Sequence, residues 1–153
     1  MPLQIINSFA TWILKKRIHQ MELFLKYPHE VQEELLFNLI KASENTQLGK
    51  KYDFSSMKSY TSFSERIPVS TYEELEPLIE KTRQGEQNVF WHSNIKWFAK
   101  SSGTTNAKSK FIPVSSEALE NCHYKASKDL LCLYLNNNEE SQMFTGKSLR
   151  LGG

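Results

Sequence analysis

Cysteine is scarce in this chain: of 153 residues only two are cysteines, Cys122 and Cys132. The hydrophobic pattern places both on one helix, where a rise of about 1.5 Å per residue separates them by roughly 15 Å, too far for a disulfide. We therefore expect two buried core thiols. The low cysteine content excludes a disulfide scaffold and fits a reducing compartment, so we expect a cytoplasmic protein.

A strong excess of charge of one sign is also missing. The chain carries 19 Lys and Arg residues against 17 Asp and Glu residues, a formal net charge of +2. A nucleic-acid-binding domain needs a basic face that neutralises phosphates, and none stands out, so we expect no nucleic-acid partner. The four histidines have no metal-ligand spacing. One acidic group is interpreted as a solvated helix face: Glu73, Glu74, Glu76 and Glu80.

No apolar run is long enough to cross a bilayer, so we expect no membrane span. The apolar N-terminal segment is followed, not preceded, by Lys15, Lys16 and Arg17, which is the reverse of a signal peptide. A membrane-surface role for this basic cluster is the weaker alternative. We expect the first helix to pack against the second instead.

Three common catalytic or phosphate-binding motifs are absent. A Walker A loop needs a second glycine where this chain has Lys108, counting from Gly103, and a dinucleotide fingerprint needs three glycines where this loop has one. The G-x-S-x-G nucleophile elbow is missing as well. These absences exclude the familiar forms of nucleotide loop and serine hydrolase site.

What the chain does contain is a hydroxyl-rich loop, Ser101-Ser102-Gly103-Thr104-Thr105, followed by Lys110. Exposed backbone N–H groups and hydroxyls in such a loop can converge on phosphate oxygens, and glycine allows close backbone approach. Lys110 would add a point charge suited to a mobile polyphosphate. A polar surface turn is the alternative for the five loop residues alone, but the lysine and Ile112-Pro113 favour phosphate binding.

The surrounding pattern predicts an α/β domain, helical over residues 1–86, with strand, phosphate loop, strand and helix over 88–135. Gly49 and Gly85 are expected to end helices, and Pro77 to separate a first turn at 71–75 from a helix at 76–84. Two overlapping capping boxes start that region, Ser70 with Glu73 and Thr71 with Glu74. The other expected elements are helices at 5–26, 30–45 and 60–66, strands at 95–99, 111–114 and 147–151, and a helix after Ser115 with an apolar stripe of Leu119, Cys122, Ala126, Leu130 and Leu133.

The hydroxyl-rich loop with Lys110 and Pro113 resembles the nucleotide-phosphate motif of adenylate-forming enzymes, the superfamily of firefly luciferase and acyl-CoA synthetases. It is more similar to the auxin-conjugating (Gretchen-Hagen-type) acyl-acid amido synthetases, and the flanking segments resemble their bacterial branch. Those segments are Ile67-Pro68-Val69-Ser70-Thr71-Tyr72-Glu73-Glu74-Leu75, Arg83-Gln84-Gly85-Glu86 and Trp97-Phe98-Ala99-Lys100. The resemblance covers nearly the whole chain but only the N-terminal part of such an enzyme.

The resemblance implies an ATP-dependent ligase that activates a small carboxylic acid as an acyl-adenylate and then joins it to an amine or amino acid, with Mg²⁺ alongside. It implies that residues 1–153 are N-terminal helices plus a partial sheet of the large domain. Lys110 is the implied catalytic residue, with Lys108 a weaker candidate. The implied phosphate-binding residues are Ser101, Ser102, Gly103, Thr104, Thr105 and Lys110, and no residue is assigned as a metal ligand.

We expect this chain alone not to catalyse the full reaction, because the adenine-binding and acyl-binding elements of such enzymes lie further along the chain. The alternative is a stand-alone, non-catalytic α/β module that binds a phosphate-bearing ligand or serves as an interaction domain. Continuation of the reading frame past Gly153 would distinguish the two.

Overall fold

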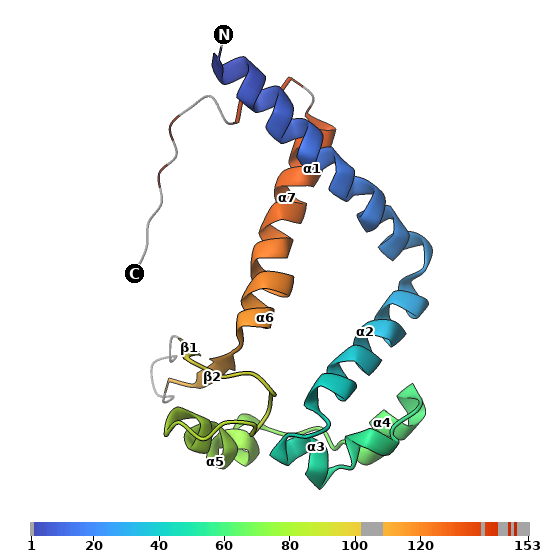
Figure 1. Ribbon diagram of the computed structural model, residues 1–153, viewed down its shortest axis with the longest axis vertical. Coiled ribbons are helices and arrows are strands. Elements are labelled where there is room, and N and C mark those ends of the chain that lie inside the picture. Colours follow the sequence, from blue (N-terminus) through green and yellow to red (C-terminus); the bar gives the residue numbers. More distant parts are fainter. Residues whose placement is uncertain (1, 102–108, 139, 144–146, 148, 150–153) are drawn as a thin grey trace. The chain divides into compact units, whose positions relative to one another are not determined.

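The computed structural model describes residues 2–101, 109–138, 140–143, 147 and 149 (Figure 1). These residues form helices and a two-stranded antiparallel sheet, which confirms the mixed α/β class. The chain divides into two compact units, one made of Met1–Pro28 with Asn121–Gly153 and the other of His29–Glu120. Each unit is described by itself below.

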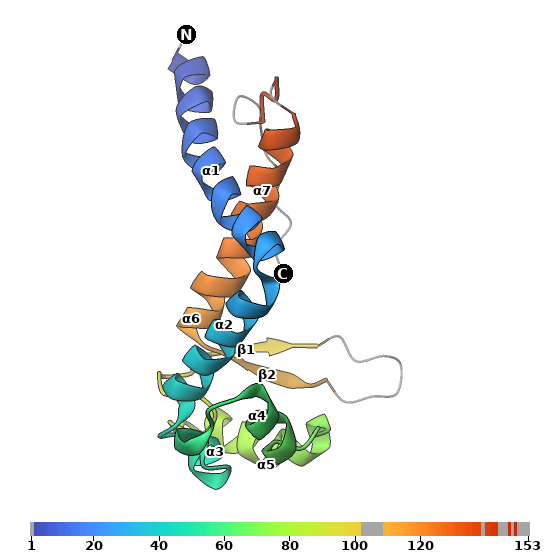
Figure 2. The ribbon, with the colours of Figure 1, turned by 90° about the vertical axis from the view of Figure 1, so that its right-hand side faces the viewer.

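The first unit is built on α1 (Pro2–Lys26) and α7 (Lys125–Asn137), which pack against each other (Figures 1 and 2). The Arg17 guanidinium makes a two-pronged contact with the Asp129 carboxylate, at 2.7 and 3.1 Å. Cys132 and Leu135 of α7 are fully buried. The partner of α1 within this unit is therefore α7, not the second helix that the sequence analysis expected.

The apolar stripe expected after Ser115 is wrong in its phase. A π-helical segment, Leu119–Tyr124, precedes α7 and holds more residues per turn than an α-helix, so it rotates the face that follows. Leu130 and Leu133 are 69% and 47% exposed, whereas Cys132 and Leu135 are buried. Cys122 is exposed, so the expectation of two core thiols holds for Cys132 alone.

The second unit begins with helices, which are followed by a hairpin and a short helix (Figure 1). Its small apolar core contains Ile40, Phe54 and Met57, against which partly buried side chains of α2 and α4 pack. The elements are α2 (Pro28–Ser43, which starts at the boundary), α3 (Gln47–Lys51), a 3₁₀ turn (Phe54–Ser56), α4 (Tyr60–Arg66), α5 (Tyr72–Arg83), β1 (Trp97–Lys100), β2 (Phe111–Val114) and α6 (Ser116–Ala118).

The sequence analysis expected Gly49 to end a helix, and this is wrong. Gly49 lies buried inside α3, a helix that the sequence analysis missed. A Cβ atom at this position would lie 2.0 Å from the Ser43 carbonyl oxygen, so only glycine fits where α3 turns back on the end of α2. Thr46 caps α3: its buried hydroxyl accepts the Gly49 N–H and donates to the Ser43 carbonyl. The glycine therefore serves close packing rather than helix termination.

Helix α5 is continuous, and the expected break before Pro77 does not occur. Thr71 is its N-cap, forming a reciprocal capping box with Glu74. Gly85, with a φ of +98°, closes it: the Gly85 N–H donates to the Thr82 carbonyl and the next N–H to the Lys81 carbonyl. The expected stop at Gly85 is confirmed, and of the two possible capping boxes the structure uses Thr71 with Glu74.

The two strands form an antiparallel hairpin in which Trp97 pairs with Val114 and Lys100 with Phe111. The second strand has the expected bounds, whereas the first begins two residues later than expected. Ser115 caps α6 by accepting the Ala118 N–H at 3.0 Å, as expected. Of the strand expected at 147–151, only residues 147 and 149 are described, and neither lies in a regular element.

Candidate functional site

The candidate site is the loop end of the β1–β2 hairpin, where the segment that contains the hydroxyl-rich loop joins the two strands. Ser101 and Lys110 flank this loop, and the expected phosphate-binding residues between them, Ser102, Gly103, Thr104 and Thr105, lie outside the described residues, as does Lys108. The Ser101 N–H donates to the Lys110 carbonyl and the Lys110 N–H donates to Ser101 Oγ, both at 2.9 Å. The strand pairing therefore continues to the mouth of the loop and fixes the distance between its ends.

The Lys110 side chain contacts the first turn of α5. Its Nζ atom lies 3.0 Å from Glu73 Oε1 and 4.8 Å from the centre of the Tyr72 ring. The hydrogen bond from Lys110 is the main reason that the pKa of Glu73 lies below its ordinary value, and the backbone N–H of Glu73 adds to the effect. Both side chains keep contact with solvent: that of Lys110 is 42% exposed and that of Glu73 is 66% exposed.

The same helix also holds the strand that follows Lys110. The Phe111 N–H donates to the Tyr72 hydroxyl at 3.0 Å, and the Arg83 guanidinium lies 4.0 Å from the centre of the Phe111 ring. Both ends of α5 therefore contact the start of β2. The sequence analysis placed Glu73 on a solvated face and gave Tyr72 no role, although its overlapping capping boxes already put both residues in the first turn of a helix.

Glu117 of α6 contacts three side chains of the segment that leads into β1. Its Oε2 atom accepts the Trp91 indole N–H at 3.2 Å and the Ser93 hydroxyl at 2.8 Å, and His92 Nε2 lies 3.8 Å from Oε1. Its own backbone N–H, more than these hydrogen bonds, lowers the pKa of Glu117. The Trp91 indole N–H is thus used within the protein.

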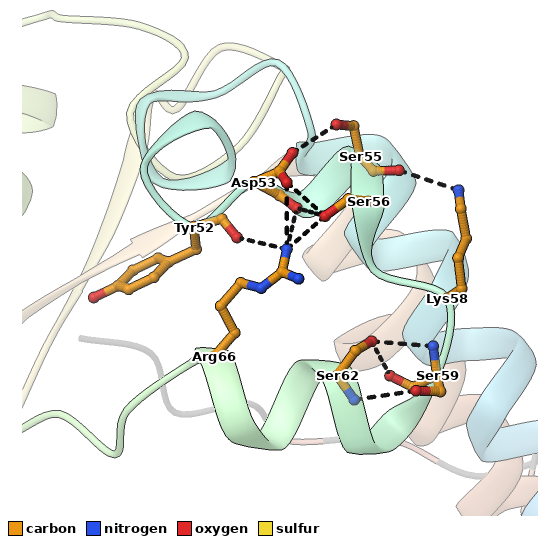
Figure 3. A network of polar contacts seen from close by, with 8 residues as sticks. All are labelled: Tyr52, Asp53, Ser55, Ser56, Lys58, Ser59, Ser62 and Arg66. Carbon is orange, nitrogen blue, oxygen red and sulfur yellow. Dashed lines mark hydrogen bonds and ion pairs between the residues drawn. The ribbon is translucent and has the colours of Figure 1, made fainter.

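A second polar network joins α4 to the 3₁₀ turn (Figure 3). The Arg66 guanidinium donates to the Asp53 carbonyl at 2.9 Å and to Ser56 Oγ at 2.6 Å. The hydroxyls of Ser55 and Ser56 donate to the Asp53 carboxylate at 2.9 and 2.5 Å. Each group in this network has a partner within it, so its evident task is to hold α4 in place. An open hollow of about 400 Å³ lies nearby, with Ile40 and Met57 in its wall and Lys41 and Glu44 among its lining residues.

Nowhere among the described residues do three or more His, Cys, Asp or Glu side chains gather in a way that could hold a metal ion. None of the helices in this described part is both long and apolar enough to cross a membrane.

Comparison with known proteins places this hairpin in a family context. Residues 17–152 match the family model described as the GH3 family N-terminal domain. The chain is 30% identical over 106 residues to indole-3-acetic acid-amido synthetase GH3.2 of Arabidopsis thaliana, covering 69% of this chain and 19% of that protein. It is 27% identical over 136 residues to jasmonoyl–L-amino acid synthetase JAR4 of Nicotiana attenuata, covering 87% of this chain and 22% of that protein.

The match to the family model extends well beyond the loop on both sides. Residues 17–152 run from within α1 to beyond α7 and include the hairpin. The chain spans about a fifth of the length of these two relatives. Both relatives are named as synthetases, the first of them as an amido synthetase, and such enzymes are ligases. The family resemblance inferred from the loop and its flanks is thereby confirmed, and the chain belongs to the GH3 family.

Proposed function

We propose that this chain is the N-terminal part of an ATP-dependent acyl-acid amido synthetase. The observation that best supports the proposal is the loop mouth: two hydrogen bonds donated by backbone N–H groups join Ser101 and Lys110, and the Lys110 side chain is 42% exposed beside them. Such an arrangement suits a polyphosphate, because a fixed loop base orients N–H and hydroxyl donors and an exposed lysine supplies charge. Family membership supports the same activity.

In the proposed reaction a substrate carboxylate oxygen attacks the α-phosphorus of ATP. A new O–P bond forms, and the bond to the β-phosphate oxygen breaks to release pyrophosphate. An amine then attacks the acyl carbon of the adenylate, forming the amide, losing a proton and releasing AMP. Ser101, Ser102, Gly103, Thr104 and Thr105 would hold the phosphates, and Lys110 would neutralise charge that develops on pyrophosphate. Positioning and electrostatic stabilisation supply most of the rate enhancement in such chemistry.

The described residues give no support for a metal held by protein side chains alone. They contain no cluster of three potential ligands for a cation. Mg²⁺ commonly binds through substrate phosphates with only one or two carboxylates. We therefore propose that Mg²⁺ enters with ATP, where it would shield the phosphate charges, while Lys110 contributes a fixed positive charge at the loop mouth.

The names of the relatives suggest substrates for this protein. Indole-3-acetic acid and jasmonate are small carboxylic acids, and an L-amino acid is the amine in the jasmonoyl synthetase. We propose the same classes here, a small carboxylic acid and an amino acid, and a cytoplasmic location that suits two unpaired cysteines. Because the chain spans about a fifth of these relatives, we propose that the adenine and acyl sites require residues outside it.

Exchange of labelled pyrophosphate into ATP tests the proposal. The full-length natural protein should catalyse exchange with at least one acid from a panel of indole-3-acetate, jasmonate, benzoate and short fatty acids. Omitting the acid or introducing Lys110→Ala should abolish it, and the isolated chain should show none. The assignment would be contradicted if the full-length protein failed to bind MgATP, or if the Lys110→Ala variant exchanged pyrophosphate at an unchanged rate. A native protein of 17.8 kDa without exchange would favour the non-catalytic module.

A further inference from the structure

The side chain of Lys110 is held by two residues that belong to no phosphate-binding motif. The Glu73 carboxylate oxygen Oε1 lies 3.0 Å from Lys110 Nζ, and the centre of the Tyr72 ring lies 4.8 Å from the same nitrogen. Both residues come from the first turn of α5, nearly 40 positions away along the chain. The contact is therefore a tertiary one, set by how α5 meets the hairpin.

The backbone of this region fixes the contact as well. The Tyr72 hydroxyl accepts the N–H of Phe111, the residue next to Lys110, at 3.0 Å. Helix α5 is capped at its start by Thr71 and Glu74 and at its end by Gly85. Glu73 thus lies on a capped helix, and that helix is itself hydrogen-bonded to the strand that follows Lys110. This arrangement favours one direction for the lysine side chain.

Holding the lysine in advance has a physical benefit for ligand binding. A lysine side chain has many rotamers and loses that freedom when it binds a phosphate. An ammonium has three hydrogen-bond donors, and Glu73 needs one, which leaves others for a ligand. Because both partners are partly exposed, the ion pair itself is weak and can adjust as the phosphates arrive.

We propose that Glu73 and Tyr72 are positioning residues that orient the Lys110 ammonium toward the β- and γ-phosphates of ATP. This inference rests on the proposed function. It assigns no chemistry to Glu73 itself, whose carboxylate acts only through the lysine. Removing the negative charge at position 73 should therefore weaken MgATP binding through Lys110 and by no other route.

The test is calorimetric titration of the full-length protein with MgATP and, separately, with AMP, which lacks the β- and γ-phosphates. Lys110→Ala should weaken MgATP binding about ten-fold or more, the scale of a lost hydrogen bond to a charged group. Glu73→Gln should weaken it about three- to ten-fold, and the double variant should match Lys110→Ala alone. AMP affinity should stay unchanged in Glu73→Gln.

The matched control is Glu76→Gln. Glu76 is an exposed carboxylate on the same helix, with no ion-pair or hydrogen-bond partner among the described residues. It should leave both affinities unchanged.

The outcomes separate the two proposals. If Lys110→Ala binds MgATP as tightly as the natural protein, the proposed function of the loop fails. If Lys110→Ala weakens binding but Glu73→Gln behaves like Glu76→Gln, only the positioning role fails. Additive losses in the double variant, or equal losses for AMP, would show a general structural effect and overturn the inference. Tighter MgATP binding by Glu73→Gln would also overturn it, since Glu73 would then compete with phosphate.

Discussion

Asp53 has two unusual features, a left-handed backbone conformation and a carboxylate whose charge is stabilised by its neighbours. Its φ of 51° lies in the left-handed region, where aspartate and asparagine are better tolerated than most residues. Hydrogen bonds from the Ser56 and Ser55 hydroxyls, and then the charge of Arg66, hold the pKa of its carboxyl below the ordinary value of 3.8. The same side chain therefore supports the turn and anchors the arginine of α4 (Figure 3).

This lowered pKa predicts how stability changes with acid. Because the folded state holds the charged form, the unfolded state takes up the proton first as the pH falls. The contribution of Asp53 is present above pH 3.8 and is lost as the pH falls through the lower pKa of the folded state. We expect Asp53→Asn, which suits the same φ, to lower stability at neutral pH and to reduce the loss of stability on acidification. Urea midpoints measured from pH 6 to pH 2.5 check this; parallel curves for both proteins would contradict it.

Among the helices, α5 contributes most to the candidate site, and its start decides which residues face Lys110. With Thr71 as N-cap, Glu74 occupies the capping-box position and Glu73 remains available for the lysine. If Ser70 were the cap, Glu73 would itself close the box. The choice between two overlapping sequence signals therefore determines whether the lysine has a carboxylate partner.

This choice can be measured. Thr71→Ala should destabilise the chain by about 0.5–2 kcal/mol, the usual loss for an N-cap. Ser70→Ala is the matched control: the Ser70 hydroxyl has only a 3.5 Å contact with the Pro68 carbonyl, so its change should stay within about 0.5 kcal/mol. Urea unfolding of both variants gives the comparison. A larger loss in Ser70→Ala would mean that the helix starts one residue earlier.

Local signals in the sequence were enough for some of these elements and not for others. Helix α4, strand β2, the Ser115 cap and the Gly85 stop were predicted because apolar patterns, capping residues and glycine act within a few residues of themselves. Gly49 was misread because its reason is the approach of the Ser43 carbonyl, which is a packing contact. The Lys110–Glu73 pair was missed for the same reason. The loop sequence identifies the lysine, but it contains no signal for the helix that packs against it.

The two units of the molecule differ in how much apolar surface their described side chains bury. In the first, Cys132 and Leu135 are buried, whereas the second buries Ile40, Phe54, Met57, Ile79, Val89 and Ile95. The candidate site, from α5 to the hairpin, belongs entirely to the second unit. Because burial of apolar surface is the main stabilising term in folding, we expect the second unit to be the more stable.

The buried thiol of Cys132 provides a probe of this difference. Burial, and to a smaller extent Asp129, raises the pKa of Cys132 above its ordinary value of 9.0, so the folded unit should protect it from thiol reagents, whereas the exposed Cys122 should react at once. In a Cys122→Ser variant, pulses of reagent at increasing urea should label Cys132 before the circular dichroism of the rest of the chain is lost. Coincident transitions would instead show that both units unfold as one cooperative body. An early transition would mean that the α1–α7 pair opens while the hairpin and α5 remain folded, so the geometry around Lys110 does not depend on that pair.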